Sequence, residues 1–245
     1  MSSLTISGIV FAVVFGGAIF GMLLRAMLPE HHLSAESRDV VKLGMGLIAT
    51  ITALVLGLLI ASAKSSYDAQ RNGLAQLAAN VGLLDRTLAR YGPEAKDARE
   101  QIRNAVADMV KRTQDSAATE PPGRYEYIFQ TIESLHPKSE AQRSLQGAAL
   151  KICSDIAQAR WTLFAEKGTS VPIPFLVVMV FWLAMLFASF SLFATPNATV
   201  VVTLLICAVS VAGAVFLILE LDQPFAGLIR LPSAPLTSAL DQLGK

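Results

Sequence analysis

Three long stretches without a charged residue constrain the fold more than any other feature of this sequence. They cover residues 1–24, 43–63 and 168–219, and all three are rich in apolar side chains. A helix needs roughly 20 apolar residues to cross about 30 Å of hydrocarbon. Charged residues make up only 16% of the whole chain, whereas a soluble domain carries about a quarter. We therefore predict an integral membrane protein.

The third stretch is too long for a single span. Proline and asparagine favour a turn, so Thr195-Pro196-Asn197 is expected to divide the stretch into a tight helical hairpin. Four transmembrane helices result. They are expected at Thr5–Leu24, Leu43–Ala63, Ile173–Ala194 and Ala198–Leu219.

The distribution of lysine and arginine predicts the orientation. The connection between the first two spans carries three basic residues, whereas the middle segment and the tail carry 17. Basic residues near the ends of spans favour the cytoplasmic side. We therefore expect a multi-pass protein of the plasma membrane (the bacterial inner membrane), with both termini and the middle segment in the cytoplasm.

The middle segment reads as a helical domain continuous with the membrane helices. Leu74, Leu77, Val81 and Leu84 recur at the spacing of one helix face. With no proline between Pro29 and Pro93, the second span can continue as one helix from about Ser34 to Tyr91. Gly92 suits the position after a helix end, and Pro93 can begin the next helix. The expected fold class is all-α.

These boundaries predict four regions. Residues 1–63 hold the first two transmembrane helices, 64–167 a cytosolic helical domain, 168–222 the last two transmembrane helices, and 223–245 a C-terminal interfacial tail. Pro224 ends the last span, and Gly227 permits a turn. Phe225 can then lie at the membrane interface with Arg230 among the headgroups. The residues of this C-terminal motif are Asp222, Pro224, Phe225, Gly227 and Arg230.

The second span differs from its neighbours because it has no aromatic residue and carries a series of small ones. Small residues let helix backbones approach closely, so one interpretation is tight helix packing. The other is a pore wall, in which the second spans of several subunits surround a conduit. Thr50 would then supply a hydroxyl, Leu54 or Leu58 an apolar constriction, and Lys64 a ring of positive charge. The pore-lining candidates are Gly46, Thr50, Ala53, Leu54, Gly57, Leu58, Ala61 and Lys64.

Signatures of catalysis and of metal binding are missing from the sequence. The three histidines are His31, His32 and His136, and no cysteine pair has the spacing of a zinc site. No glycine-rich phosphate loop or serine elbow occurs. The basic and acidic residues nearly cancel, which argues against a nucleic-acid partner. We predict no catalytic residue, no metal, no cofactor and no enzymatic activity.

Four motifs of the sequence carry a family resemblance. They are ALVLGLLIASAKSSYDAQR at Ala53–Arg71, LDRTLARYGPEA at Leu84–Ala95, WLAMLFASFSLFATPN at Trp182–Asn197 and LDQPFAGLIRL at Leu221–Leu231. With them the chain resembles the bestrophin-like family of four-span membrane proteins, a domain of unknown function with remote similarity to bestrophins. The resemblance implies a pentamer by analogy, and a chloride channel with a pore lined by the second span. Calcium gating is not implied, because the sequence lacks an acidic cluster resembling a calcium clasp.

Two functions remain open at this point. The first is an oligomeric ion channel that conducts small inorganic anions such as chloride. The alternative is a non-conducting membrane scaffold or sensor whose cytosolic helices bind a protein partner. In both cases the expected partners are the lipid bilayer and further copies of the chain.

Overall fold

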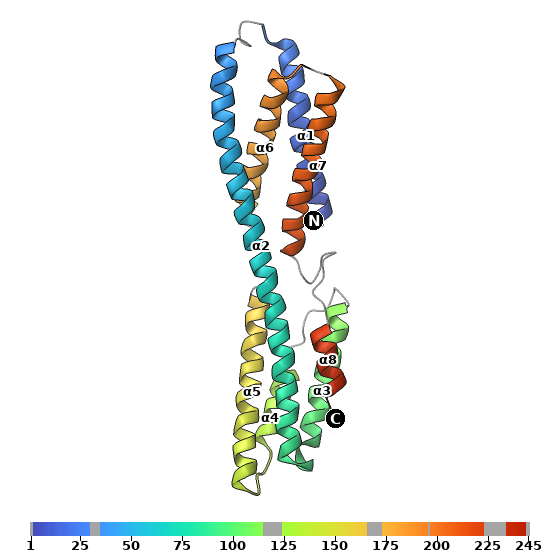
Figure 1. The fold of residues 1–245 in the computed structure, drawn as a ribbon. Coiled ribbons are helices and arrows are strands. Elements are labelled where there is room, and N and C mark those ends of the chain that lie inside the picture. The colour runs from blue at the N-terminus through green and yellow to red at the C-terminus, as the bar shows by residue number, and fades with distance from the viewer. Residues whose placement is uncertain are drawn as a thin grey trace. The chain divides into compact units, whose positions relative to one another are not determined.

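A computed structural model describes residues 2–29, 35–114, 124–165, 173–195, 197–222 and 234–243. All regular structure in these residues is helical, which confirms the all-α fold class (Figure 1). The elements are α1 (Ser3–Met27), α2 (Ala35–Tyr91), the short 3₁₀ helix η2 (Pro93–Ala95), α3 (Lys96–Gln114), α4 (Arg124–Glu133), α5 (Glu140–Ala165), α6 (Ile173–Phe193), α7 (Ala198–Leu221) and α8 (Ala234–Gln242).

Four of these helices, α1, α2, α6 and α7, are long and apolar enough to span a membrane. The four predicted spans are thus confirmed. The second span is part of a single 57-residue helix that ends at Tyr91, as the sequence predicted. Its expected N-cap, Ser34, lies outside the described residues.

Contacts within the chain define two compact units. The first contains α1, α6, α7 and the part of α2 up to Tyr67. The second contains α2 from Asp68 onward, together with η2, α3, α4, α5 and α8. Helix α2 therefore contributes to both cores.

In the first unit, α1 packs against both α6 and α7. The core between them is formed by fully buried side chains such as Val14, Met179 and Val215. The closest approach involves two glycines of α1. A Cβ atom on Gly17 would lie 2.7 Å from the carbonyl oxygen of Ala184, and one on Gly21 would overlap the carbonyl oxygen of Ala188. Small residues on both helices let α1 and α6 meet at backbone distance.

The break between α6 and α7 lies where the sequence predicted it. Helix α6 ends at Phe193 and α7 begins at Ala198. Asn197 is the N-cap of α7, and its side-chain oxygen accepts a hydrogen bond from the backbone N–H of Val200 at 2.9 Å. This bond satisfies one of the otherwise unpaired donors of the first turn.

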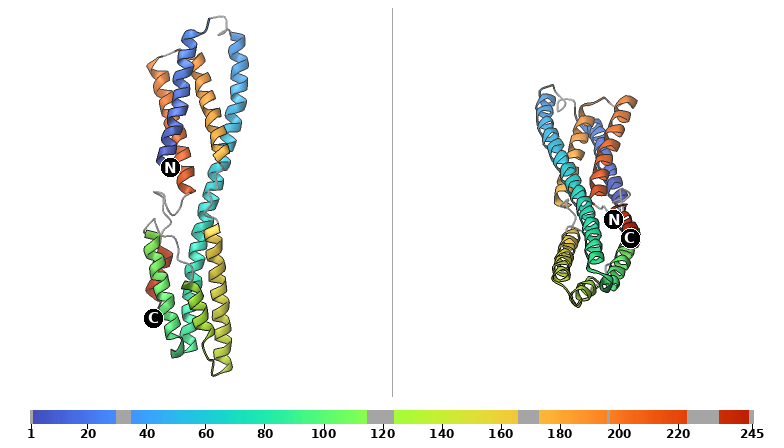
Figure 2. Two further views of the ribbon diagram at one scale, coloured as in Figure 1. Left: turned by 180° about the vertical axis from the view of Figure 1, so that it is seen from behind. Right: turned by 60° about the horizontal axis from the view of Figure 1, so that its bottom comes forward.

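The second unit has its own apolar core. The leucines expected on one face of α2 are buried there, and Ile132 of α4 and Ala149 of α5 complete the core. Helix α8 packs beside α3 (Figure 2). Leu236 of α8 is fully buried in the same core, joined by Leu243 just beyond the helix. The sequence analysis did not predict this helix within 223–245.

The end of α2 is held by backbone geometry and by polar contacts. Gly92 has a φ of 128°, which side chains with a Cβ rarely adopt, and η2 follows at once. The side-chain amide of Gln142 donates to the carbonyl oxygen of Tyr91 at 3.0 Å. Further back on α2, the buried carboxylate of Asp85 accepts two hydrogen bonds from Arg99 of α3, at 2.7 and 2.9 Å.

Candidate pore-lining helix

The predicted pore-lining residues all lie on α2, and none of them is buried within the described part of the chain. Each is exposed, including the two leucines, which are 65% and 62% exposed. The residues are Gly46, Thr50, Ala53, Leu54, Gly57, Leu58, Ala61 and Lys64. The structure therefore places them together on the free side of one helix.

The opposite side of α2 provides the contacts within the chain. Thr52, Leu59 and Ala63 are buried, and they recur at the spacing of one helix face. The hydroxyl of Thr52 donates to the carbonyl oxygen of Ile48 at 2.7 Å, so this polar group is satisfied inside the apolar core. One face of α2 is thus buried within the described part of the chain, and the face with the small residues is exposed there.

The small residues of α2 do not bring two helices of this chain together. A Cβ atom added to Gly46 or Gly57 would meet nothing within 4 Å. This differs from Gly17 and Gly21 of α1, where an added Cβ would meet the backbone of α6. Among the described glycines, those that approach the backbone of another helix are Gly17 and Gly21, at the α1–α6 contact. The sequence carried its signal in the Gly17-x-x-x-Gly21 spacing, which the analysis did not single out.

Thr50 contributes a polar atom to the exposed face of α2. Its hydroxyl donates to the carbonyl oxygen of Gly46 at 2.9 Å. In this rotamer the proton is used by the helix backbone, and the lone pairs of the oxygen remain as acceptors. A hydrated cation or a water molecule could use them directly, whereas an anion requires rotation of the hydroxyl.

Lys64 ends the apolar stretch of α2. Its side chain is exposed, and Ala63 beside it is completely buried in the core of the first unit. The buried neighbour fixes the rotation of the helix at this point. The lysine therefore lies on the same exposed side of the helix as Ala61.

At the end of the first unit near Met27, two arginines bind the C-terminus of α6. Arg25 donates to the carbonyl oxygen of Ala194 at 2.7 Å, and Arg38 donates to that of Phe193, also at 2.7 Å. The Arg38 guanidinium also lies over the Phe193 ring, 5.8 Å from its centroid. Both charges stabilise the negative end of the helix dipole and satisfy its last carbonyl groups. The sequence analysis used these arginines only to predict orientation.

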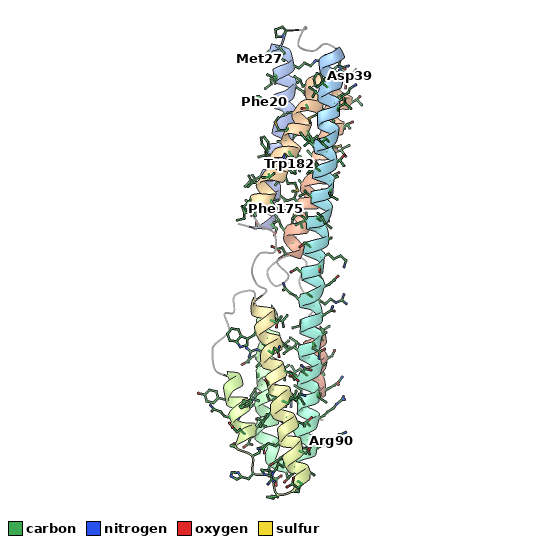
Figure 3. All side chains as sticks on the ribbon, turned by 90° about the vertical axis from the view of Figure 1, so that its left-hand side faces the viewer. Phe20, Met27, Asp39, Arg90, Phe175 and Trp182 are labelled. Carbon is green, nitrogen blue, oxygen red and sulfur yellow. The ribbon has the colours of Figure 1, made fainter. Side chains whose placement is uncertain are left out.

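Large apolar side chains cover much of the remaining surface of the membrane helices. Phe20 on α1 and Phe175 on α6 are more than half exposed, and Figure 3 shows both pointing outward. Less than a third of each candidate span is buried within the chain. Lipid or other subunits are therefore needed to cover these helices.

Of the C-terminal motif, the structure describes only the first residue. Asp222 is the C-cap of α7, and its backbone N–H donates to the carbonyl oxygen of Ile218 at 3.1 Å. Glu220, two residues earlier, is buried. Pro224, Phe225, Gly227 and Arg230 lie outside the described residues, as do His31 and His32. Among the residues that are described, no cluster of histidine, cysteine and acidic side chains could hold a metal ion.

Comparison with known proteins identifies relatives of this architecture. A family model described as "Bestrophin-like domain" matches residues 6–236. The fold is similar to the crystal structure of a point mutant of a bacterial bestrophin homologue from Klebsiella pneumoniae, with a TM-score of 0.69 and 15% sequence identity over 96% of each chain. No curated protein matches the sequence.

Proposed function

The chain belongs to the Bestrophin-like family, and from this premise we propose that it is the subunit of an oligomeric, anion-conducting channel with a pore lined by α2. The single observation that carries the proposal is the exposed face of α2. Small residues, one hydroxyl and two leucines are exposed there, and an added Cβ atom on Gly46 or Gly57 would meet nothing within 4 Å. In a homo-oligomer with α2 nearest the symmetry axis, this face surrounds a narrow conduit. By analogy with bestrophins the oligomer is a pentamer.

Anion preference in this proposal comes from position 64. An oligomer places one Lys64 from each subunit around the cytoplasmic end of the apolar conduit, which raises the local concentration of anions. Solvent at this mouth screens the charge, so the expected selectivity is a few-fold bias. The basic residues of the middle segment support the proposed orientation, with both termini in the cytoplasm.

The second candidate function is a non-conducting scaffold or sensor that binds a protein partner. Two exposed aromatic side chains of the second unit favour it, Trp161 at 76% and Tyr127 at 68% exposure. Tryptophan and tyrosine are enriched at the centres of protein interfaces. We would adopt this function in place of the channel if the purified protein passes no current.

Conductance across a planar bilayer, measured with purified protein in a chloride gradient, tests the channel. Lys64→Glu should move the reversal potential toward cation preference, because it replaces a positive ring by a negative one. Lys151→Glu on α5 makes the same change of charge at another exposed position and should leave the potential unchanged. Equal shifts in both variants, or none in either, would contradict a pore at position 64.

The assembly is tested by added bulk on the same face. Gly57→Leu fills space that is empty in the single chain and should weaken the association of subunits around α2. Gly16→Leu is the matched control, since Gly16 of α1 also faces open space. Native mass spectrometry in mild detergent gives the subunit number. A wild-type protein that is only monomeric would refute the proposal.

A further inference from the structure

Two arginines at one end of the first unit have no acidic partner among the described residues. Arg25 lies near the end of α1, and Arg38 lies in the first turn of α2. Neither forms an ion pair with a carboxylate in the part of the chain that the structure describes. The carboxylate of Asp39, next in the sequence, lies 3.8 Å from Lys42 instead. Both arginines are partly buried, so water solvates only part of their charge.

The two guanidinium groups lie close together, because they donate to consecutive carbonyl groups. The acceptors belong to Phe193 and Ala194 at the end of α6, and each bond is 2.7 Å long. Consecutive Cα atoms are about 3.8 Å apart, so groups bound to neighbouring carbonyls lie within roughly 10 Å of each other. The contact of Arg38 with the Phe193 ring restricts the orientation of its guanidinium. All of these residues belong to the first unit.

The end of α6 neutralises only part of the charge that it receives. A helix C-terminus carries roughly half a negative charge, whereas two guanidinium groups carry two positive ones. Each guanidinium has five N–H donors and donates one of them to α6. The Nε–H group of Arg38 is buried and has no acceptor among the described residues. Positive charge and several N–H donors therefore remain for an anion.

The depth of this pair in the membrane indicates which anion it meets. From Ser3 to Arg25 the first helix rises about 33 Å, which is close to the thickness of the hydrocarbon core. The arginines therefore lie at the level of the lipid headgroups. Met27 and Leu43, near them in the sequence, are 82% and 78% exposed, and Figure 3 shows Met27 at this end of the unit. A phospholipid offers a phosphate to the arginines and acyl chains to such apolar side chains, whereas a free inorganic anion matches only the arginines.

We propose that Arg25 and Arg38 form a binding site for the phosphate group of an anionic phospholipid. The phosphate oxygens accept N–H groups that the carbonyls of α6 leave unused, and the bound lipid links α1, α2 and α6. The excess of positive charge favours phosphatidylglycerol over phosphatidylcholine, because the choline group of the latter adds a further cation. The site needs only one copy of the chain, so it is independent of conduction and of assembly.

The test measures how added lipid changes the melting temperature of the purified protein in mild detergent. Phosphatidylglycerol should raise this temperature more than phosphatidylcholine does, and inorganic phosphate at the same concentration should hardly change it. In Arg25→Gln and in Arg38→Gln, the rise should require about ten-fold more phosphatidylglycerol, because each variant loses a hydrogen bond to a charged group. Lys42→Gln is the matched control. It removes an exposed charge from the same end of α2 and should respond as the wild type does.

The response to lipid distinguishes a binding site from a simple helix cap. If the arginines only cap α6, both glutamine variants melt at a lower temperature but respond to phosphatidylglycerol as the wild type does, which overturns the proposal. A wild type that phosphatidylglycerol does not stabilise overturns it as well. Equal stabilisation by inorganic phosphate would assign the site to a free anion, and equal stabilisation by phosphatidylcholine would show that charge is not recognised; both refute the proposal. If a glutamine variant does not fold, Arg38→Lys replaces it, since lysine keeps the charge but loses the planar fork and should bind phosphatidylglycerol more weakly than the wild type.

Discussion

Replacing Gly21 with valine should force α1 away from α6 and destabilise the first unit. Even a Cβ at this position overlaps the carbonyl oxygen of Ala188. One turn away, a Cβ on Gly17 would have to move from 2.7 Å to the ordinary 3.4 Å, a shift of about 0.7 Å. The obstacle is helix backbone, which cannot rotate aside as a side chain can. The two helices must therefore separate over the length of their contact.

The cost follows from the size of this separation. A gap of 0.5 to 1 Å forfeits about a quarter to a half of the dispersion energy between facing atoms. Overpacking of this kind typically costs about 1–3 kcal/mol, and valine gains only a few tenths over glycine in helix preference. A net loss of about 2 kcal/mol lowers the melting temperature by roughly 4–8 °C for a chain of this size.

The matched control is Gly16→Val on the same helix. Gly16 is the neighbour of Gly17, and a Cβ there meets nothing within 4 Å. Thermal unfolding in detergent should show a fall for Gly21→Val only, with all proteins heated at one scan rate because unfolding of such proteins is often irreversible. Equal melting temperatures for the two variants would refute the close contact between α1 and α6.

Three further predictions concern the second unit and the topology. Arg99→Met should destabilise the protein by about 3–5 kcal/mol because it removes the guanidinium that pairs with the buried Asp85 carboxylate, whereas Lys138→Met, which removes an exposed pair with Glu94, should hardly change the unfolding midpoint in urea. Burial raises the pKa of the Cys153 thiol to about 11, so about one part in a thousand of this thiol is thiolate at pH 8. Labelling of Cys153 by a maleimide, followed by mass spectrometry, should therefore be slow at pH 8 and should accelerate as the pH rises toward 11. Single cysteines at Ser34 and Ser116 report orientation: on intact cells an impermeant thiol reagent should label position 34 only, and labelling of position 116 alone would reverse the topology.

The fold was largely predictable because its signals are local. Runs without charge define the spans, and the absence of proline between Pro29 and Pro93 let one helix be predicted through to Tyr91. Pairings between distant segments could not be predicted in this way. The sequence shows that Gly17 and Gly21 are small, but not that Ala184 and Ala188 face them. Helix α8 was missed for the same reason. Its nine residues are stabilised by burial of Leu236 in a core that distant helices build, and a short sequence pattern does not show this.

The candidate site was predictable in its composition and not in its orientation. The spacing of three or four residues and the small size of the side chains identified Gly46, Gly57 and their neighbours on α2 as pore-lining candidates. Which side of the helix faces its own chain depends on the packing of Thr52, Leu59 and Ala63, and no local pattern distinguishes a core side from a lipid or pore side in an apolar span. The hydroxyl of Thr50 illustrates the same limit, because its hydrogen bond to the carbonyl oxygen of Gly46 depends on a side-chain rotamer that the sequence does not show.

The bond between Arg25 and the end of α6 also has a consequence for biosynthesis. Its partner carbonyl, on Ala194, lies 169 residues later in the chain. At translation rates of about 5–20 residues per second, the first span waits roughly 10–30 s in the bilayer before this partner is made. During that time the side of α1 that carries Gly17 and Gly21 has no α6 to pack against. Helix α1 must therefore remain in the membrane without this partner, and its lack of any charge before Arg25 favours this.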